Sequence, residues 1–170
     1  MNEPAGRHLV LVGLMGVGKT TVGKLLAQRL GRGLVDSDLR IEARTGRTVK
    51  QILDEDGLAE MRSQEAAALF DALDDDEPRV IAAAAGVVLD PRNRERLNAA
   101  DADVVWLTAD PTLLAPRTAT RAHRPWLDED PVGTLRRMQD EREPMYREVA
   151  DRTVAVDGLT PDEIADRVLR

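Results

Sequence analysis

The stretch GLMGVGKT, residues 13–20, decides the fold of this chain. It fits the pattern G-x-x-x-x-G-K-[ST] in full, and it lies between the apolar run LVLVG at 9–13 and the amphipathic segment KTTVGKLLAQRL at 19–30. A buried strand, a glycine-rich turn and a helix in this order are typical of a phosphate-binding loop, or P-loop. The stretch therefore predicts a nucleotide site built into an α/β fold.

Each residue type in the loop has a physical reason to be there. Glycines let the backbone turn its N–H groups inward around a phosphate, and the following helix adds its positive N-terminus. Lys19 supplies a mobile charge for the outer phosphates and is expected to be catalytic, while the Thr20 hydroxyl is a ligand for Mg²⁺. The residues expected to bind ATP are Gly13, Gly16, Val17, Gly18, Lys19, Thr20 and Thr21.

Strand-like and helical segments alternate along the rest of the chain. We expect strands at 9–13, 33–38, 79–85, 103–109 and 152–157. We expect helices at 19–30, 48–57, 58–73 and 131–150, and others opening at Asp90, Asp110 and Thr160, with Pro144 bending or breaking the one from 131. The polar stretch 117–130 is interpreted as a loop. This alternation predicts a parallel sheet with helices on both faces, in one domain over residues 1–170.

Composition excludes several classes of function. The chain has 170 residues, 42% of them hydrophobic and 32% charged, which suits a globular domain. No apolar run reaches the length of a membrane span, and the N-terminus lacks a signal-peptide layout. The absence of cysteine excludes disulfides and thiolate metal sites, and the net charge of −7 argues against general nucleic-acid binding. We therefore expect a cytoplasmic protein without a nucleic-acid or membrane partner.

The group that accepts the phosphate has to come from other strand ends. Asp36 and Asp38 close the second expected strand, and residues two apart in an extended chain face the same way. One carboxylate can complete a metal shell while the other orients or deprotonates an acceptor hydroxyl. The alternative is a helix N-cap followed by a solvated acid.

Basic residues further along the chain have two interpretations. Arg62 and Glu65 are one helical turn apart, a spacing that normally indicates a surface ion pair. Arg117, Arg121 and Arg124 lie in the stretch 117–130, which is either a solvated basic run or a lid that covers the phosphates and excludes water.

Taken together, these motifs resemble the shikimate kinases. The segments that carry the resemblance follow in order over nearly the whole chain: GLMGVGKTTVGKLLA, DSD, TGRTVKQILDEDG, MRSQE, VIAAAAGVVL, RPWL and EREPMYREVAD. The resemblance implies a three-layer P-loop kinase fold, that of the nucleoside monophosphate kinases, with a five-stranded parallel sheet and a lid at about 117–130. It implies ATP- and Mg²⁺-dependent transfer of a phosphoryl group to shikimate, giving shikimate 3-phosphate, by a protein that we expect to be a monomer.

On the nucleotide side, the resemblance implies roles for residues outside the P-loop. Asp36 lies near the metal that Thr20 also holds. Arg117 lies over the adenine, with Pro161 on its other side. Arg124, in the lid, stabilises the transferring phosphoryl group and counts as catalytic, because such transfer is catalysed mainly by placed charges.

On the acceptor side, the resemblance implies a small anionic substrate. Asp38 holds the accepting hydroxyl and is catalytic. Arg62 and Arg142 grip the substrate carboxylate, for which bidentate arginines are well suited. The backbone at Ala85 and Gly86 contacts the acceptor.

The acceptor side also departs from the family pattern. Ala84 and Ala85 replace the first two of three glycines expected after strand three, and Gly86 is kept. A methyl group there costs little if φ is negative, and roughly 1 kcal/mol or more if φ is positive. Leu53 and Met61 stand where phenylalanine is usual. These changes leave two alternatives open, a kinase for a related hydroxy acid or cyclitol and a non-catalytic ATP-binding regulatory protein.

Overall fold

The computed structural model describes residues 6–119 and 129–170, and five parallel strands form one sheet in the order β2-β3-β1-β4-β5. The strands are β1 (His8–Val12), β2 (Leu34–Asp36), β3 (Val80–Ala82), β4 (Ala102–Thr108) and β5 (Arg152–Ala155). The helices are α1 (Lys19–Leu30), α2 (Ser37–Thr45), α3 (Val49–Asp56), α4 (Leu58–Leu73), the 3₁₀ helix η1 (Val87–Leu89), α5 (Pro91–Ala99), α6 (Pro111–Ala119), α7 (Pro131–Val149) and α8 (Pro161–Val168).

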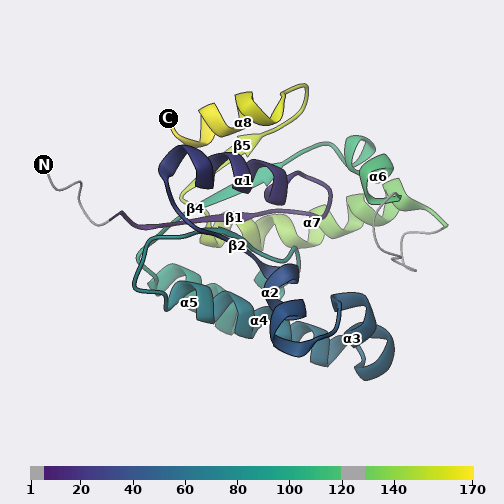
Figure 1. Ribbon diagram of the computed structural model, residues 1–170. Coiled ribbons are helices and arrows are strands. Elements are labelled where there is room, and N and C mark those ends of the chain that lie inside the picture. Colours follow the sequence, from purple (N-terminus) through teal and green to yellow (C-terminus); the bar gives the residue numbers. More distant parts are fainter. Residues whose placement is uncertain (1–5, 120–128) are drawn as a thin grey trace, which may run out of the picture.

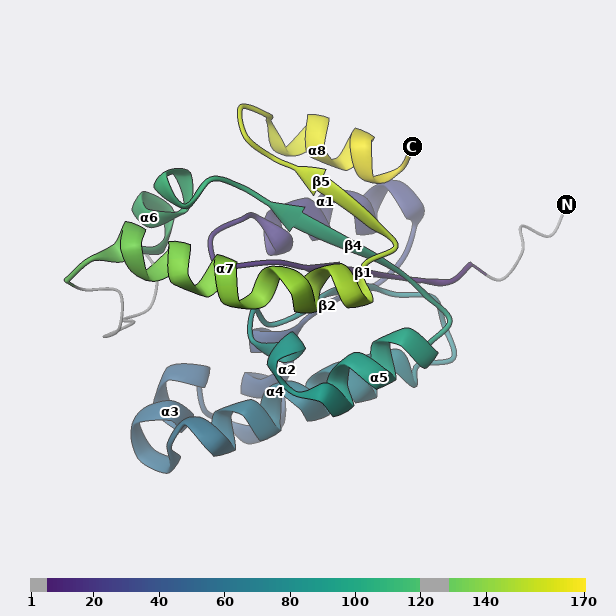
Figure 2. The same cartoon turned by 180° about the vertical axis from the view of Figure 1, so that it is seen from behind.

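The helices make three layers with the sheet. Figures 1 and 2 show α1 and α8 against one face of the sheet, and α4, α5 and α7 against the other. Buried strand residues such as Val10, Leu11 and Val105 are fully covered, as parallel sheets require. The predicted α/β fold with helices on both faces is confirmed.

Sheet topology places the P-loop at the centre of the carboxyl edge. Strand β1 pairs with β3 on one side (Val10↔Ile81) and with β4 on the other (Val10↔Val104). Neighbours on its two sides come from different parts of the chain, so β1 lies at the topological switch point where ligands of such sheets bind.

Several helix ends form as the sequence predicts. Gly31 ends α1 with φ at 62°, a left-handed conformation that favours glycine. Thr48 and Gln51 form the expected capping box of α3, and Thr160 and Glu163 form that of α8. These caps satisfy backbone N–H groups locally, which is why they can be predicted without the tertiary structure.

The strand predicted at 33–38 is wrong in its last two residues, because β2 ends at Asp36 and α2 begins at Ser37. The side chain of Asp36 accepts a hydrogen bond from the backbone N–H of Leu39 at 3.1 Å, so it is an N-cap. Asp38 lies in the first helical turn. The two carboxylates are therefore not aligned along an extended strand.

Three further expectations need correction. Strand β3 ends at Ala82 because the chain turns into η1, with the Val87 N–H bound to the carbonyl of Ala84 at 3.2 Å. The expected loop at 117–130 overlaps the last turn of α6, and residues 120–128 lie outside the described part. Pro144 does not break α7, which continues to Val149. The sheet-facing residues Tyr146 and Val149 are buried, and this packing outweighs the hydrogen bond that the proline cannot donate.

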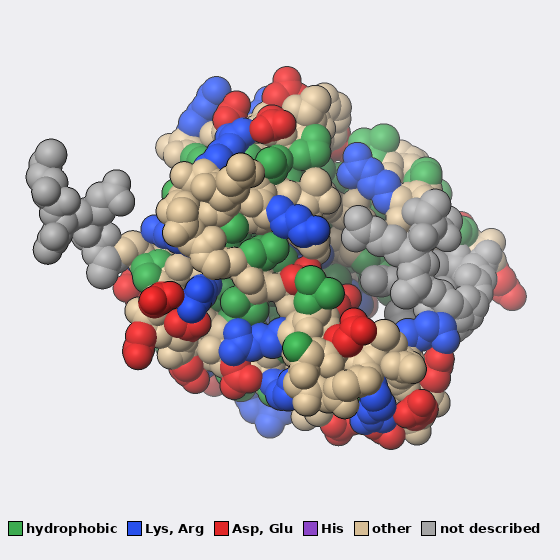
Figure 3. Space-filling model, viewed as in Figure 1, with side chains coloured by type: hydrophobic (Ala, Val, Ile, Leu, Met, Phe, Trp, Pro, Cys, Tyr) green, Lys and Arg blue, Asp and Glu red, His purple; other side chains and the backbone are tan. Residues whose placement is uncertain are grey.

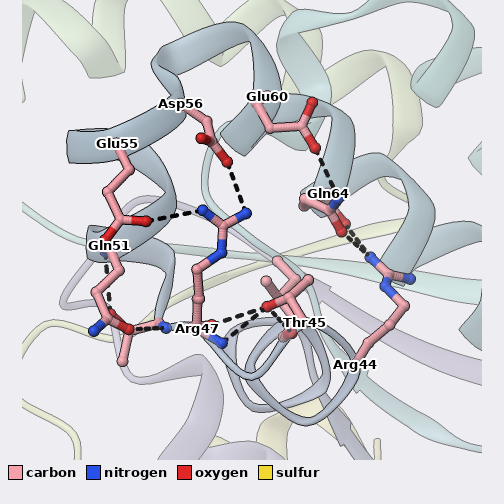
Figure 4. Close-up of polar contacts among 10 residues, drawn as sticks. Arg44, Thr45, Arg47, Gln51, Glu55, Asp56, Glu60 and Gln64 are labelled. Atoms are coloured by element: carbon pink, nitrogen blue, oxygen red, sulfur yellow. Dashed lines mark hydrogen bonds and ion pairs between the residues drawn. The ribbon is translucent and has the colours of Figure 1, made fainter.

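Two separate hydrophobic clusters fill the interior. The larger one lies on both faces of the sheet, whereas the smaller one contains Ile41, Ile52, Met61 and Ala68 and joins α2, α3 and α4. Polar contacts on the outside reinforce this small cluster, as Figure 4 shows. There Arg47 pairs with Glu55 at 3.0 Å and with Asp56 at 2.7 Å, tying the start of α3 to its end. The α2–α4 unit thus has a small cluster of its own beside the sheet, while Leu69, Ala72 and Leu73 at the end of α4 pack in the larger cluster.

Within the described ranges, none of the helices has both the length and the apolar character that spanning a membrane would require. On the face seen in Figure 3, acidic and basic side chains are intermixed over the surface.

Candidate active site

The P-loop has the glycine-specific backbone that its sequence predicts. Gly13, Gly16 and Gly18 have φ values of 147°, 82° and 105°, and no described residue other than glycine has a positive φ. A Cβ at Gly13 would collide with the carbonyl oxygen of Leu107, and one at Gly16 would lie 3.1 Å from Cγ2 of Thr118. Glycine at these positions is required by conformation and by space.

The N-terminus of α1 is prepared for an anion. Its N-cap, Gly18, offers no side-chain hydrogen bond, and the first turn of α1 contains no acidic residue. Lys19 bends back over the loop, where its Nζ donates to the carbonyl oxygens of Gly13 at 2.7 Å and Leu14 at 3.1 Å. A positive helix end and an ammonium group at one loop form a phosphate site, because phosphate oxygens can replace the carbonyls.

Beside this loop lies a set of hard oxygen atoms. The Thr20 hydroxyl donates to Oδ2 of Asp36 at 2.6 Å, and the buried Oγ of Ser37 has no hydrogen-bond partner. The described residues contain no group of three or more His, Cys, Asp or Glu side chains that could hold a metal alone. Two protein oxygens completed by phosphate oxygens and water suit Mg²⁺, which keeps several waters in such sites.

The P-loop opens into a cavity of about 170 Å³ between the sheet edge and the α2–α4 unit. Most of the residues proposed from the sequence line it. They are Gly16, Gly18, Lys19, Thr20, Asp36, Asp38, Arg62, Ala85, Gly86 and Arg142. Residues from five separate parts of the chain therefore share one cavity, with the nucleotide and acceptor candidates next to each other.

The pair of Arg62 and Glu65 is not the surface ion pair that its spacing normally indicates. Arg62 Nη1 lies 2.8 Å from Oε2 of Glu65, and Glu65 is only 5% exposed. Burial raises the pKa of Glu65, and the nearby carboxylate of Asp38 raises it further, while Arg62 and Arg142 oppose the shift. Glu65 thus belongs to the wall of the cavity, and only its spacing from Arg62 marked it in the sequence.

The turn at 84–86 shows whether the methyl groups of Ala84 and Ala85 strain the backbone. The φ of Gly86 is −90°, and neither Ala84 nor Ala85 has a positive φ, so the methyl groups cause no backbone strain. Gly86 is needed for a different reason, because a Cβ there would overlap the guanidinium of Arg62. In this turn the side chain of a neighbouring arginine, and not the backbone conformation, selects glycine.

Arg142 enters the cavity from α7 and is 5% exposed. Its Nη1 makes a long contact of 3.4 Å with the carbonyl oxygen of Ala85, and its buried Nε has no hydrogen-bond partner. The same carbonyl accepts a hydrogen bond of 2.7 Å from the Tyr146 hydroxyl. A buried guanidinium whose Nε is left without a partner is suited to receive an anion.

The remaining wall of the cavity is largely apolar and comes from α3 and α4. Val49 and Leu53 lie half-buried on α3, and Met61 is buried on α4, with Lys50 beside them. Of these, Val49 and Lys50 were not predicted as site residues. Their only signal is their place directly after the Thr48 cap. An apolar wall opposite the charged groups suits a small ring that carries its polar groups on one side.

Some proposed residues do not line the cavity. Arg117, near the end of α6, contacts the carbonyl of Gly16 at 3.3 Å, whereas Pro161 is the exposed first residue of α8. Val17 is buried in the main core and Thr21 is exposed on α1, so only their backbone N–H groups are candidates for phosphate binding. Arg124 lies outside the described residues.

Comparison with known proteins gives a consistent result. A family model described as "Shikimate kinase" matches residues 15–170. A shikimate kinase of Dechloromonas aromatica is 42% identical over 167 residues, covering 96% of this chain and 89% of that protein. A solved structure described as shikimate kinase from Acinetobacter baumannii in complex with shikimate has a TM-score of 0.90 at 36% identity, covering 96% and 91% of the two chains. Another, from Bacteroides thetaiotaomicron, has a TM-score of 0.85 at 27% identity, covering 95% and 96%.

Proposed function

Because this chain belongs to the shikimate kinase family, we propose that its cavity transfers the γ-phosphoryl group of ATP to a hydroxyl of shikimate. One observation carries the assignment of roles to residues. The P-loop lysine, the two aspartates and the two arginines line the same cavity of about 170 Å³.

On the nucleotide side, the loop 13–20 holds the phosphates of ATP through its N–H groups, and Lys19 neutralises their charge. Thr20 and Asp36, whose oxygens are 2.6 Å apart, would hold Mg²⁺. When bound, the ion neutralises charge on the β- and γ-phosphates. Ser37, with its orphaned hydroxyl, is placed to bind a water of the same shell.

On the acceptor side, Arg142 and Arg62 bind the carboxylate of shikimate. The Nε of Arg142 has no hydrogen-bond partner and is available to an anion, while Arg62 is paired with Glu65 at 2.8 Å. The ring of the substrate lies against Leu53 and Met61. Asp38 stands on the first turn of α2, where its exposed carboxylate can accept a hydrogen bond from the reacting hydroxyl.

The transfer step follows from these positions. The hydroxyl oxygen forms a bond to the γ-phosphorus as the bond from that phosphorus to the bridging oxygen of ADP breaks, and the hydroxyl proton leaves toward Asp38. Lys19 stays on the phosphates while the negative charge shifts toward ADP. Catalysis here is mainly positioning and charge neutralisation, as is general for phosphoryl transfer.

The direct test is Mg²⁺- and ATP-dependent release of ADP with shikimate, against a control without acceptor and a panel of hydroxy acids and cyclitols. We expect saturable stimulation by shikimate. ADP release only with another acceptor would contradict shikimate as the substrate. No ADP release with any acceptor, despite ATP binding, would contradict the kinase function.

The division of roles gives a sharper prediction. Lys19→Ala should lower kcat by about 10²-fold or more, because it removes a charge placed on the transferring group. Arg142→Ala should mainly raise the KM for shikimate, by an amount equivalent to about 2–4 kcal/mol. Lys24→Ala is the matched control, since Lys24 is exposed on the same helix as Lys19. Equal losses of ATP affinity in both site variants would refute the division.

A further inference from the structure

We infer that Tyr146 is a positioning residue for the acceptor: its hydroxyl fixes the Ala85–Gly86 peptide so that the Gly86 N–H stays available to the substrate. This inference rests on the proposed function. Tyr146 does not line the cavity and was given no role by the sequence, although it stands in the segment EREPMYREVAD.

The contact is direct and buried. The Tyr146 hydroxyl donates to the carbonyl oxygen of Ala85 at 2.7 Å, and the side chain is 1% exposed. In a planar trans peptide the carbonyl of one residue and the N–H of the next point in opposite directions. Holding the Ala85 carbonyl toward α7 therefore directs the N–H of Gly86 away from α7. Both residues line the cavity.

The neighbouring peptides are held in another way. The carbonyl of Ala84 accepts from the N–H of Val87 at 3.2 Å, and that of Gly86 accepts from Leu89 at 3.1 Å. These are local backbone bonds of the turn into η1. The Ala85 carbonyl between them is held by side chains, so its orientation depends on α7 and not on the turn itself.

Two side chains share this carbonyl, and they are not equivalent. Arg142 reaches it at 3.4 Å, a long contact compared with the 2.7 Å of Tyr146. If Arg142 binds the substrate carboxylate, its contact with the carbonyl weakens as the substrate arrives. Tyr146 also interacts with Arg142 through its hydroxyl, but it is not itself a candidate for the carboxylate, so it can keep the peptide in place when the acceptor is bound.

The phenol is mounted rigidly. Its ring stacks on Trp106 with ring centroids 5.6 Å apart and an angle of 17° between the planes, and the Arg147 guanidinium lies 5.3 Å from the centre of the Trp106 ring. Burial raises the pKa of Tyr146 to about 12, so the hydroxyl remains a donor at neutral pH. A fixed and always protonated donor is what the positioning role requires.

Tyr146→Phe removes this donor and also the interaction of the phenol oxygen with Arg142, so the Gly86 resonance described below separates the two effects. We expect the KM for shikimate to rise about 3- to 10-fold, as for the loss of one neutral hydrogen bond, while the KM for ATP is unchanged. The matched control is Arg147→Ala, which disturbs the same ring stack without touching the Ala85 carbonyl. It should leave both KM values unchanged. A purely structural role of Tyr146 would lower thermal stability without separating the two KM values.

A second measurement does not depend on turnover. The amide resonance of Gly86 in ¹H–¹⁵N spectra should move in Tyr146→Phe and stay in place in Arg147→Ala. Wild-type protein that is silent with shikimate would overturn the proposed function, and this resonance would then decide the positioning of the peptide on its own. An unmoved Gly86 resonance, an unchanged KM for shikimate in active Tyr146→Phe, or an equal rise in Arg147→Ala would overturn the inference.

Discussion

Residues 84–86 connect β3 to η1 and line the cavity, and their side chains meet different surroundings. The methyl groups of Ala84 and Ala85 pack against the main hydrophobic cluster. Gly86 has no side chain because the guanidinium of Arg62 occupies that space. At this scale, the choice between alanine and glycine depends on which neighbour lies above each Cα.

The double variant Ala84→Gly with Ala85→Gly tests this explanation. We expect the free energy of unfolding to fall by about 1–2 kcal/mol in total, because glycine gains chain entropy in the unfolded state and the packed methyl groups are lost. We expect kcat/KM for shikimate to stay within about twofold, since no backbone strain is relieved. Urea denaturation and steady-state kinetics measure the two effects. A rise of several-fold in turnover would show that the methyl groups do obstruct the acceptor.

Gly86→Ala is the comparison at the adjacent position. The new methyl group should displace the guanidinium of Arg62 from its place beside Glu65, and the protein should still fold because only the end of a side chain has to move. The KM for shikimate should rise about tenfold or more, because a charged grip on the carboxylate is lost. An unchanged KM would mean that Arg62 does not bind the acceptor from its present position.

Tyr146 allows a titration of one group, because it is the chain's only tyrosine. Ultraviolet difference absorbance should show ionisation with a pKa of about 12 in the folded protein, compared with an ordinary value of 10.0. Because the folded pKa lies above the unfolded one, its contribution to stability is complete below pH 10 and is lost as the pH rises toward 12. Over that window wild type should lose stability more steeply than Tyr146→Phe. A folded-state pKa near 10 would contradict the burial of this phenol.

At the scale of elements, the start of α2 sets the positions of the two acidic residues Asp36 and Asp38. Asp36 is at once the last residue of β2, the N-cap of α2 and the hydrogen-bond partner of Thr20. Asp38 then lies in the first turn of α2. Asp36, the candidate metal ligand, is held at the end of a strand. Asp38, the candidate partner of the acceptor hydroxyl, is held at the start of a helix, so the two carboxylates occupy different positions in the same cavity.

Helix α3 forms part of the acceptor wall, although Ile52 is its only buried residue. Its two ends are linked by Arg47 through Glu55 and Asp56 (Figure 4). Arg47→Ala should loosen α3 and raise the KM for shikimate, with the KM for ATP unchanged. Arg29→Ala is the matched control, because Arg29 also binds two carboxylates but joins α1 to α8. An equal rise of the KM for shikimate in both variants would contradict a specific role of Arg47.

At the scale of the whole molecule, the cavity lies between a large core and a small one. The small cluster of the α2–α4 unit has four buried residues, while the large one spans both faces of the sheet. Free energies of local opening follow such differences in buried contacts. The acceptor wall is therefore the less stable side of the site, and the P-loop is the more stable one.

Hydrogen exchange followed by mass spectrometry tests this difference. The amides of α3 should exchange well before those of β1, and shikimate should slow exchange in α3 more than an ATP analogue does. In about 1 M salt, where the Debye length is about 3 Å, the ion pairs of Arg47 weaken and exchange in α3 should speed up while β1 is unaffected. Uniform exchange across both parts would show that the protein opens as one unit.

The sequence by itself determined the features that depend on local chemistry. The P-loop glycines, the caps at Thr48 and Thr160 and the alternation of strands and helices all rest on neighbouring residues, and the structure has each of them. The resemblance to a known family added the expected roles of residues that lie far apart in the chain. Asp36 shows the limit of such predictions. In the sequence, an aspartate at this position is equally consistent with the end of a strand and with the N-cap of a helix.

Only the tertiary structure decided what each side chain faces. It buried Glu65 in the wall of the cavity and brought the Tyr146 hydroxyl to the Ala85 carbonyl. It also showed that a side chain at position 86 would overlap the guanidinium of Arg62. These partners come from α4, α7 and the turn after β3, which are far apart in the chain. Their contacts arise from packing of elements against one another, and no local pattern of residues records which elements will meet.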